Sequence, residues 1–122
     1  MIEKLGIGTD ITDINKFKKI TYSSNKKFYE KIFLPSEIKH CLRYKNPSPH
    51  FAGKFAVKES VIKSITEKIS FLDIEIFYSH SKPQIKLKSK IHKKYIFQVS
   101  ISHEGNFAIA VVISEKKKKY QK

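Results

Sequence analysis

The first part of the chain alternates between large apolar and small or polar side chains. This period of two over residues 5–12 predicts a β-strand, because successive side chains of a strand point to opposite faces. One face of that strand carries no bulky side chain and consists of Gly6, Gly8, Asp10 and Thr12. Glycines there would let another backbone or a ligand approach closely. We therefore expect the Asp10 carboxylate to project into a space with few bulky neighbours.

The middle of the chain changes to helical spacing. Apolar residues recur at intervals of three and four from His50 to about Thr66, which predicts the longest helix of the protein. The proline-containing run at residues 46–49 is a helix breaker in front of it. Shorter segments are predicted earlier in the chain: helices over residues 14–20 (capped by Asp13 or Asn15) and 36–44 (capped by Ser36), and a short apolar segment over residues 28–33.

The second half of the chain returns to alternation and is dominated by predicted strands. Helices and strands that do not alternate strictly along the chain predict an α+β protein with a largely antiparallel sheet. The charged residues 115–122 are expected to fray, and residues 89–95 are ambiguous, a short helix being one option. The predicted strands cover residues 71–78, 84–88, 97–102 and 107–114, with a turn at residues 79–83 and a hairpin loop at residues 103–106.

Length and charge narrow the class of protein. The length of 122 residues predicts one domain, covering residues 1–122, with limited room for a deep active site of its own; sites shared between subunits are therefore considered. The net charge of +14 suggests nucleic acid, an anionic surface or a polyanionic ligand. Arg43 is the only arginine, however, and arginine is preferred for recognising bases and phosphates. The abundance of both lysine and isoleucine also fits a general drift in the amino-acid composition of the whole proteome, in which case the positive charge does not mark a binding face.

Redox and targeting features are few. Cys41 is the only cysteine, which excludes an internal disulfide and a cysteine-rich zinc site within one chain, and we expect it to pack as a small apolar residue. No signal-peptide pattern follows Met1, and no run approaches the roughly 20 apolar residues that span a membrane. We therefore expect a cytoplasmic protein with no membrane partner.

Two carboxylates occupy unusual positions. Asp10 lies in an apolar strand, where an ionised group is costly unless a cation or hydrogen bonds compensate it. Glu59 lies at the border of the apolar stripe of the long helix, four residues before Lys63. Each has an ordinary explanation: Asp10 could accept backbone hydrogen bonds at a strand end, and Glu59 could pair with Lys63 in solvent. A divalent metal held by both carboxylates would explain the two together, and the lysines would suit a phosphate-bearing substrate.

Three stretches carry a resemblance to a known family: GIGTDITDI at residues 6–14, FAGKFAVKESVIKS at residues 51–64 and VSISHEGNFAIA at residues 99–110. They resemble, in order and spacing, the motifs of the holo-[acyl-carrier-protein] synthases, which are small phosphopantetheinyl transferases. The chain departs from the family pattern in having Lys16 and Lys54 where arginine is usual, which keeps the charge but loses the planar fork. It also has Ser81 where the family commonly has glycine, and it has no tryptophan.

The resemblance implies a 4′-phosphopantetheinyl transferase-like fold, with a largely antiparallel sheet packed on one long central helix and short helices. It also implies the reaction. The 4′-phosphopantetheine arm of coenzyme A is moved onto a serine of apo acyl carrier protein in fatty acid biosynthesis, and adenosine 3′,5′-bisphosphate is released. Such a step needs neutralisation of phosphate charge and in-line positioning. Family members of this length are typically homotrimers with sites between subunits.

The same resemblance implies roles for individual residues. Asp10 and Glu59 would bind Mg²⁺, and Glu59 and Lys63 would be the catalytic residues. The acceptor of the serine proton stays open between a metal-bound water, Glu59 and Lys63. Acyl carrier proteins are acidic, so a lysine-rich surface would steer them to the enzyme. The residues expected to bind coenzyme A are Lys16, Lys54, Lys63, Pro83 and His103, although His103 taken alone would be an ordinary turn residue.

Two other functions are considered. An RNA- or ribosome-binding protein would need basic residues clustered with exposed aromatic residues on one face. Most of the nine Phe and six Tyr instead fall at predicted core positions, so no nucleic-acid partner is expected. A non-catalytic domain of the same fold is the second alternative, and it would keep its function when Asp10 or Glu59 is replaced by alanine.

Overall fold

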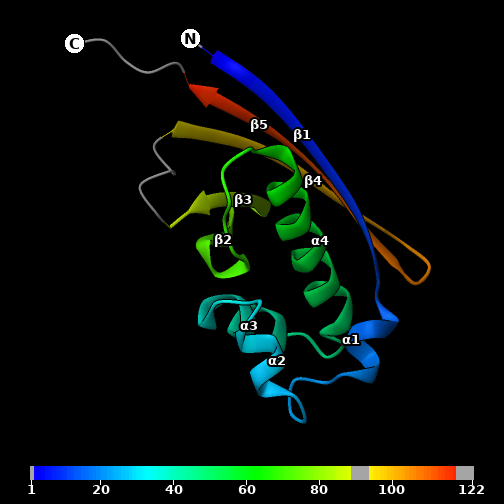
Figure 1. Cartoon of the computed structure of the whole chain (residues 1–122). Helices are drawn as coiled ribbons and strands as arrows, with labels where there is room; N and C mark the ends of the chain where they lie inside the picture. The colour runs from blue at the N-terminus through cyan, green and yellow to red at the C-terminus, as the bar shows by residue number, and fades with distance from the viewer. Residues whose placement is uncertain (1, 89–93, 118–122) are drawn as a thin grey trace.

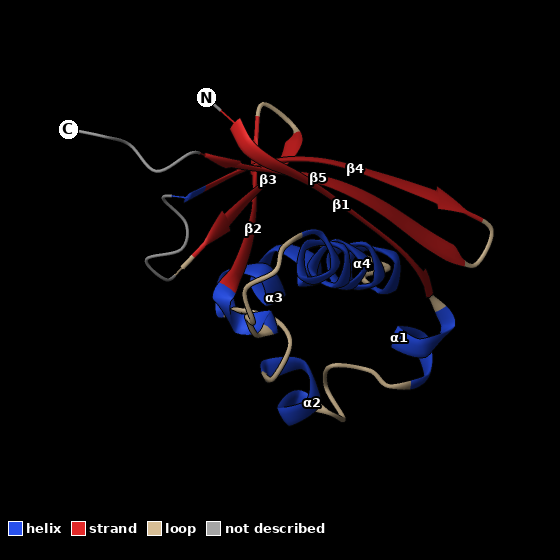
Figure 2. Ribbon diagram, turned by 45° about the horizontal axis from the view of Figure 1, so that its top comes forward, coloured by secondary structure: helices blue, strands red, loops and turns tan. Residues whose placement is uncertain are grey.

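A long central helix separates a β-sheet from a group of short helices. The computed structural model describes residues 2–88 and 94–117 of the chain. A three-stranded sheet covers one side of helix α4, and α1, α2 and α3 lie on its other side (Figure 1, Figure 2). The predicted α+β class with antiparallel strands is confirmed. In chain order the elements are β1 (Ile2–Asp13), α1 (Asn15–Lys19), α2 (Lys26–Glu30), α3 (Pro35–Leu42), α4 (Ser48–Ser64), the 3-10 turn η1 (Phe71–Asp73), β2 (Ile74–Ser79), β3 (Lys82–Leu87), β4 (Tyr95–Glu104) and β5 (Phe107–Lys117).

The strand order decides which residues share an edge of the sheet. The larger sheet has the order β1-β5-β4, and β2 and β3 form a separate antiparallel pair beside β4. Asp10 on β1 pairs with Ala110 of β5, and His103 on β4 pairs with Ala108 of β5. Asp10 and His103 therefore lie on the two outer strands of the sheet, with β5 between them.

The glycines of β1 let α4 approach the sheet. A Cβ atom built on Gly6 would lie 1.9 Å from the carbonyl oxygen of Ser64, and one on Gly8 would lie 1.9 Å from the carbonyl oxygen of Ser60. No side chain fits at either position without moving the helix backbone. The predicted close approach of another backbone at this face is confirmed, and that backbone is α4.

Two groups of buried residues lie on opposite sides of the α4 axis. An aromatic group joins α1, α2 and the start of α4, and its rings include Phe17, Tyr29, Phe33 and Phe51. An aliphatic group joins the end of α4 to the sheets and includes Val57, Val61, Ile74 and Val112. Together they fix α4 between the sheet and the short helices.

The starts of three helices differ from the predictions. The predicted N-cap Ser36 is wrong: α3 begins at Pro35, and the Glu37 carboxylate accepts the N–H of Leu34 at 2.7 Å. Helix α1 begins at Asn15, whose N–H donates to Asp13 at 2.9 Å. The proline run does not lie wholly outside the long helix, because Ser48 and Pro49 form its first turn, where proline is tolerated.

The strands also differ from their predicted ranges. Residues 71–73 form a 3-10 turn instead of the start of a strand, and the turn after β2 is only His80-Ser81, so Pro83 lies in β3. His103 belongs to β4 and not to the hairpin loop, which is reduced to Gly105-Asn106. Residues 115–117 extend β5, where fraying was predicted. The rest of that tail and residues 89–93 of the ambiguous segment lie outside the described residues.

None of the helices in residues 2–88 and 94–117 has both the length and the apolar character required to cross a membrane.

Candidate active site

Helix α4 presents a stripe of three residues toward the β1 edge of the sheet. Phe55, Glu59 and Lys63 are spaced four apart and so share one helix face. The ammonium of Lys63 donates to the carbonyl oxygen of Thr9 at 2.9 Å and lies 3.4 Å from Oδ1 of Asp10. The structure thus brings Asp10 next to α4, one helical turn from Glu59.

The Asp10 carboxylate is partly enclosed but accessible. Its side chain is 16% exposed, and that of Lys63 is 53% exposed. The second oxygen of Asp10 accepts a hydrogen bond from Oγ1 of Thr12 at 2.7 Å. Glu59 is half-buried at the same edge of the helix. We call Asp10, Glu59 and Lys63 the carboxylate centre.

The donor set of the carboxylate centre fits a hard divalent cation. In the described part of the chain, no group of three or more His, Cys, Asp or Glu residues gathers to hold a metal ion. A cation here would have the two carboxylates of Asp10 and Glu59 and would need further oxygens from a ligand and water. Mg²⁺ is commonly bound in this way, through one or two carboxylates together with substrate phosphates.

Lys16 approaches the same stripe from α1. Its ammonium lies 4.5 Å from the ring centroid of Phe55 and 5.9 Å from that of Phe17. The side chain is otherwise exposed, so its charge is available to an anion near the carboxylate centre. Asp10, Lys16, Glu59 and Lys63 are therefore grouped on one side of α4.

A cavity of about 710 Å³ lies on the opposite side of α4. It is bordered by α3, the start of α4 and the strands β2, β3 and β4. Pro83 and His103, both predicted to bind coenzyme A, line it. The remaining lining residues are His40, Tyr44, His50, Tyr78, Lys82, Gln84, Phe97, Gln98, Val99, Ser100 and Ile101.

The polar wall of this cavity consists of stacked rings. The rings of His40 and Tyr78 stack at 4.8 Å with an interplanar angle of 15°, and those of Tyr44 and His50 stack at 3.6 Å and 14°. Burial is the main cause that lowers the pKa of His40 to about 4, and the charges of Lys54 and Arg43 add to it. Flat rings next to Lys82 are suited to a planar heterocycle that carries phosphate.

His103 is held against the first turns of α4. Its Nε2 atom lies 3.1 Å from the carbonyl oxygen of Pro49. Because a carbonyl only accepts, Nε2 carries the proton and Nδ1 is left to interact with other groups. Gly53 gives the ring its space, since a Cβ there would lie 3.4 Å from Nε2 of His103.

Lys54 lies behind the cavity wall. Its side chain is 1% exposed, and its ammonium lies 3.0 Å from Nδ1 of His40 and 4.7 Å from the ring centroid of Tyr78. Burial lowers its pKa. The direct contact between Lys54 and coenzyme A stays a prediction, and in this structure His40 and Tyr78 stand between the ammonium and the cavity.

The residues predicted for one site therefore lie in two places. The carboxylate centre is beside β1, and the cavity with Pro83 and His103 is beside β4, with α4 and β5 between them. The sequence interpretation missed the stacked wall. Three wall residues, His40, Tyr44 and His50, flank the proline run, and this grouping in the sequence could have indicated them. Tyr78 comes from a distant strand, so no local pattern indicates it.

Known proteins share the sequence pattern and the fold of this chain. The model of the 4′-phosphopantetheinyl transferase superfamily matches residues 6–112. The holo-[acyl-carrier-protein] synthase of Thermodesulfovibrio yellowstonii is 40% identical over 116 residues, which span 93% of this chain and 98% of that protein. The crystal structure of Helicobacter pylori holo-[acyl-carrier-protein] synthase in complex with coenzyme A has 39% identity and a TM-score of 0.75, covering 88% of this chain and 98% of that one. The Bacillus anthracis synthase in complex with CoA (3′,5′-ADP) has 33% identity and a TM-score of 0.76, covering 92% and 96%.

Proposed function

The chain belongs to the 4′-phosphopantetheinyl transferase superfamily, and from this premise we propose that it transfers the 4′-phosphopantetheine group of coenzyme A to a serine of apo acyl carrier protein, with Mg²⁺, in fatty acid biosynthesis. The family resemblance noted in the sequence is confirmed. The observation that carries the proposal is the contact between Lys63 and Asp10, because it joins the first and the central motif at one place.

The cavity is the proposed binding place for the nucleotide part of coenzyme A. Stacked rings of His40 and Tyr78 offer a flat surface to adenine, Lys82 offers donors to phosphate oxygens, and Nδ1 of His103 offers an acceptor. Relatives with coenzyme A or its nucleotide bound support this proposal, since they share the fold over most of the chain.

The carboxylate centre is the proposed place of the diphosphate. Asp10 and Glu59 would hold Mg²⁺, which supplies charge neutralisation when it is bound. Lys63 would exchange its present partners for diphosphate oxygens and stabilise the charge that develops on the leaving phosphate. Lys16 adds a second positive charge from α1.

The reaction is an in-line displacement at phosphorus. The serine oxygen of the carrier protein forms a bond to the phosphorus that bears the pantetheine arm. The bond from that phosphorus to the bridging oxygen breaks, and adenosine 3′,5′-bisphosphate leaves with the electron pair. The serine proton passes to a base near the attacking oxygen, and Glu59, as a carboxylate of this centre, is one candidate.

The protein is proposed to be a homotrimer with sites between subunits. One chain presents the carboxylate centre and the nucleotide cavity on opposite sides of α4, so a coenzyme A molecule that uses both would span two copies. The sheet face away from α4 is apolar and exposed, as expected of a surface covered by another copy. Its exposed side chains include Leu5, Ile7, Ile11, Phe107, Val111 and Ile113.

The partner protein is proposed to approach α1 and α2. Both helices carry exposed lysines that would attract an acidic carrier protein and raise its association rate at low salt. These lysines are Lys16, Lys18, Lys19, Lys26 and Lys27. We also propose that the protein is cytoplasmic and that residues 1–122 form a single domain.

The test is the intact mass of an apo acyl carrier protein after incubation with this protein, coenzyme A and Mg²⁺. We expect a gain of one phosphopantetheine group per carrier, and none when a chelator replaces Mg²⁺. An unchanged carrier mass in the presence of folded protein would refute the function. Transfer that continues at full rate in the chelator would refute the metal requirement alone.

A further inference from the structure

Two lysines of α4 are buried, and neither belongs to the carboxylate centre. Lys54 and Lys58 lie on successive turns of the helix and are 1% and 0% exposed. A buried ammonium is costly unless hydrogen bonds or an opposite charge compensate it. Their partners therefore show what these residues do in the fold.

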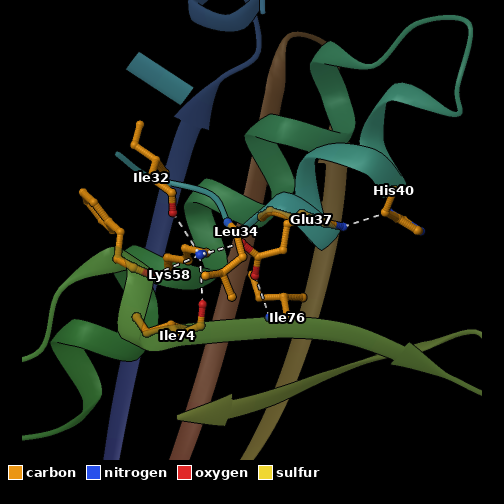
Figure 3. Close-up of polar contacts among 9 residues, drawn as sticks. Ile32, Leu34, Glu37, His40, Lys58, Ile74 and Ile76 are labelled. Carbon is orange, nitrogen blue, oxygen red and sulfur yellow. Dashed lines mark hydrogen bonds and ion pairs between the residues drawn. The ribbon is translucent and has the colours of Figure 1, made fainter. Parts of the chain in front are cut away.

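Lys58 joins three segments of the chain. Its ammonium lies 2.7 Å from Oε1 of Glu37 and donates to the carbonyl oxygens of Ile32 at 2.9 Å, Phe71 at 3.0 Å and Ile74 at 2.9 Å. Figure 3 shows Lys58 between Glu37 on α3 and Ile74 at the start of β2. The side chains of Lys58 and Glu37 are both 0% exposed.

Glu37 continues the connection from α3 to β2. Its Oε1 accepts the N–H of Leu34 at 2.7 Å, and its Oε2 accepts the N–H of Ile76 at 2.7 Å (Figure 3). The pair of Lys58 and Glu37 thus ties α4, α3 and β2 together in one buried network.

The next residues on the same three elements form a second connection. Lys54 is four residues before Lys58, His40 is three residues after Glu37, and Tyr78 is two residues after Ile76. The Lys54 ammonium lies 3.0 Å from Nδ1 of His40 and 4.7 Å from the Tyr78 ring, and the two rings stack. This second connection reaches the cavity, because His40 and Tyr78 line it.

The contact with Lys54 also fixes how His40 faces the cavity. An ammonium can only donate, so Nδ1 of His40 accepts and the proton of the neutral ring lies on Nε2. The charged or titratable groups around His40 are Arg43 and Tyr44 just after the end of α3, Lys54 and His50 on α4, and Tyr78 on β2. The positive charges among them oppose protonation of the ring.

We propose that Lys54 and Lys58 are positioning residues for the nucleotide cavity: Lys58 fixes α3 against β2 through Glu37, and Lys54 holds His40 flat on Tyr78, so the stacked wall exists before the ligand binds. This proposal rests on the function proposed above, in which that wall binds the nucleotide of coenzyme A. Lys54 acts through His40, and it does not need to touch a phosphate.

The first test is the affinity for adenosine 3′,5′-bisphosphate, measured by titration calorimetry on the purified protein. Lys54→Met keeps the length of the side chain and leaves no opposite charge unpaired. We expect an affinity about three- to tenfold lower, the range that one hydrogen bond corresponds to. Lys39→Met, on the exposed side of α3, is the control and should bind as the wild-type protein does.

A double-mutant cycle separates positioning from direct contact. His40→Phe keeps a ring on Tyr78 and removes the acceptor for Lys54. In that background, Lys54→Met should lower the affinity by less than about twofold. A loss as large as in the wild-type background would mean that Lys54 contacts the ligand itself, and the proposal would be wrong.

A nuclear magnetic resonance titration of the imidazole nitrogens tests the contact without ligand. In the wild-type protein, His40 should stay neutral down to about pH 4. In Lys54→Met its midpoint should rise, because one facing positive charge is gone. An unchanged midpoint and an unchanged affinity in Lys54→Met would overturn the proposal.

The role of Lys58 is tested through Glu37→Gln, which keeps the shape of the side chain and leaves the Lys58 ammonium with its three carbonyl acceptors in place of its opposite charge. A positioning role raises KM for coenzyme A and leaves kcat nearly unchanged, because the carboxylate centre is on the other side of α4. A purely structural role lowers the folded fraction, so kcat falls and KM stays the same, and that result would contradict the proposal. If the wild-type protein itself failed to bind the bisphosphate, the function proposed for the cavity would be wrong. If the wild-type protein binds it and the variants bind equally well, only the positioning role would be wrong.

Discussion

At the scale of single residues, Lys63 holds a position that a ligand phosphate can share. Its ammonium donates to the Thr9 carbonyl and approaches Asp10, yet the side chain is 53% exposed. Exposed ion pairs contribute about 0–1 kcal/mol to stability. Its importance for folding is therefore small compared with its expected importance for turnover.

Replacing Lys63 should separate activity from stability. In Lys63→Met we expect kcat to fall about 10²- to 10³-fold, as on loss of one group that stabilises transition-state charge. The free energy of unfolding should change by less than about 1 kcal/mol. Lys68→Met, an exposed lysine just beyond α4, is the matched control. Equal turnover in the two variants would remove Lys63 from the mechanism.

Ser81 is strained in the turn between β2 and β3. Its φ is 65°, and that of His80 is 53°, a region that glycine occupies without cost. The family resemblance predicts glycine at position 81. Ser81→Gly should raise the free energy of unfolding by about 0.5–1 kcal/mol in chemical denaturation. Ser102→Gly, in β4, should instead lower the free energy of unfolding. An equal loss of stability in both variants would show that the backbone at Ser81 is not strained.

At the scale of elements, the packing of α4 on β1 determines where Asp10 lies. A methyl group on Gly8 would lie 1.9 Å from the carbonyl oxygen of Ser60, so the backbone of β1 or of α4 would have to move. Gly8→Ala should lower the free energy of unfolding by about 1–3 kcal/mol or more. Gly53→Ala is the control, since its Cβ would meet the His103 ring at 3.4 Å and a methyl group of Ile101 at 3.5 Å, and no backbone atom is closer. A Gly8→Ala protein as stable as Gly53→Ala would refute this contact.

Features that depend on the pattern within a single helix or strand were predictable from the sequence. The alternation around Asp10 predicted its strand and the approach of a backbone to Gly6 and Gly8, because a period of two fixes the faces of a strand. Helical spacing likewise predicted α4 and placed Glu59 at the border of its buried stripe. These features depend on residues close in sequence.

Features that depend on distant residues were not predictable. Glu37 replaces Ser36 as the cap of α3 because Lys58 and the Ile76 N–H hold its carboxylate in place. Lys54 was predicted to bind coenzyme A, but its burial, which comes from α3 and β2 closing over it, was not predicted. Spacing within a helix cannot reveal which lysine another element covers.

At the scale of the whole molecule, the two halves of the proposed site lie on different sides of each chain. Asp10 of one copy and His103 of another would then form one complete site. Two inactive variants, Asp10→Asn and His103→Ala, should complement each other when they assemble together. In a mixed trimer, about one third of the sites would be free of both substitutions.

Co-expression with two different purification tags isolates such mixed trimers. Their transfer activity should reach about one third of the wild-type value at low coenzyme A concentration. The separately purified variants supply the baseline. Activity no higher than that baseline would mean that each site is built within a single chain, and the shared-site arrangement would be wrong.

The most direct measurement is the affinity for coenzyme A with and without Mg²⁺, because it asks whether Asp10 and Glu59 hold one cation against the diphosphate. The wild-type protein should bind more tightly with Mg²⁺ than in a chelator. Asp10→Asn and Glu59→Gln should each abolish that difference, and their affinity in the chelator should equal or exceed that of the wild type, since one negative charge is gone. A difference that persists unchanged in either variant would contradict a cation shared by the two carboxylates.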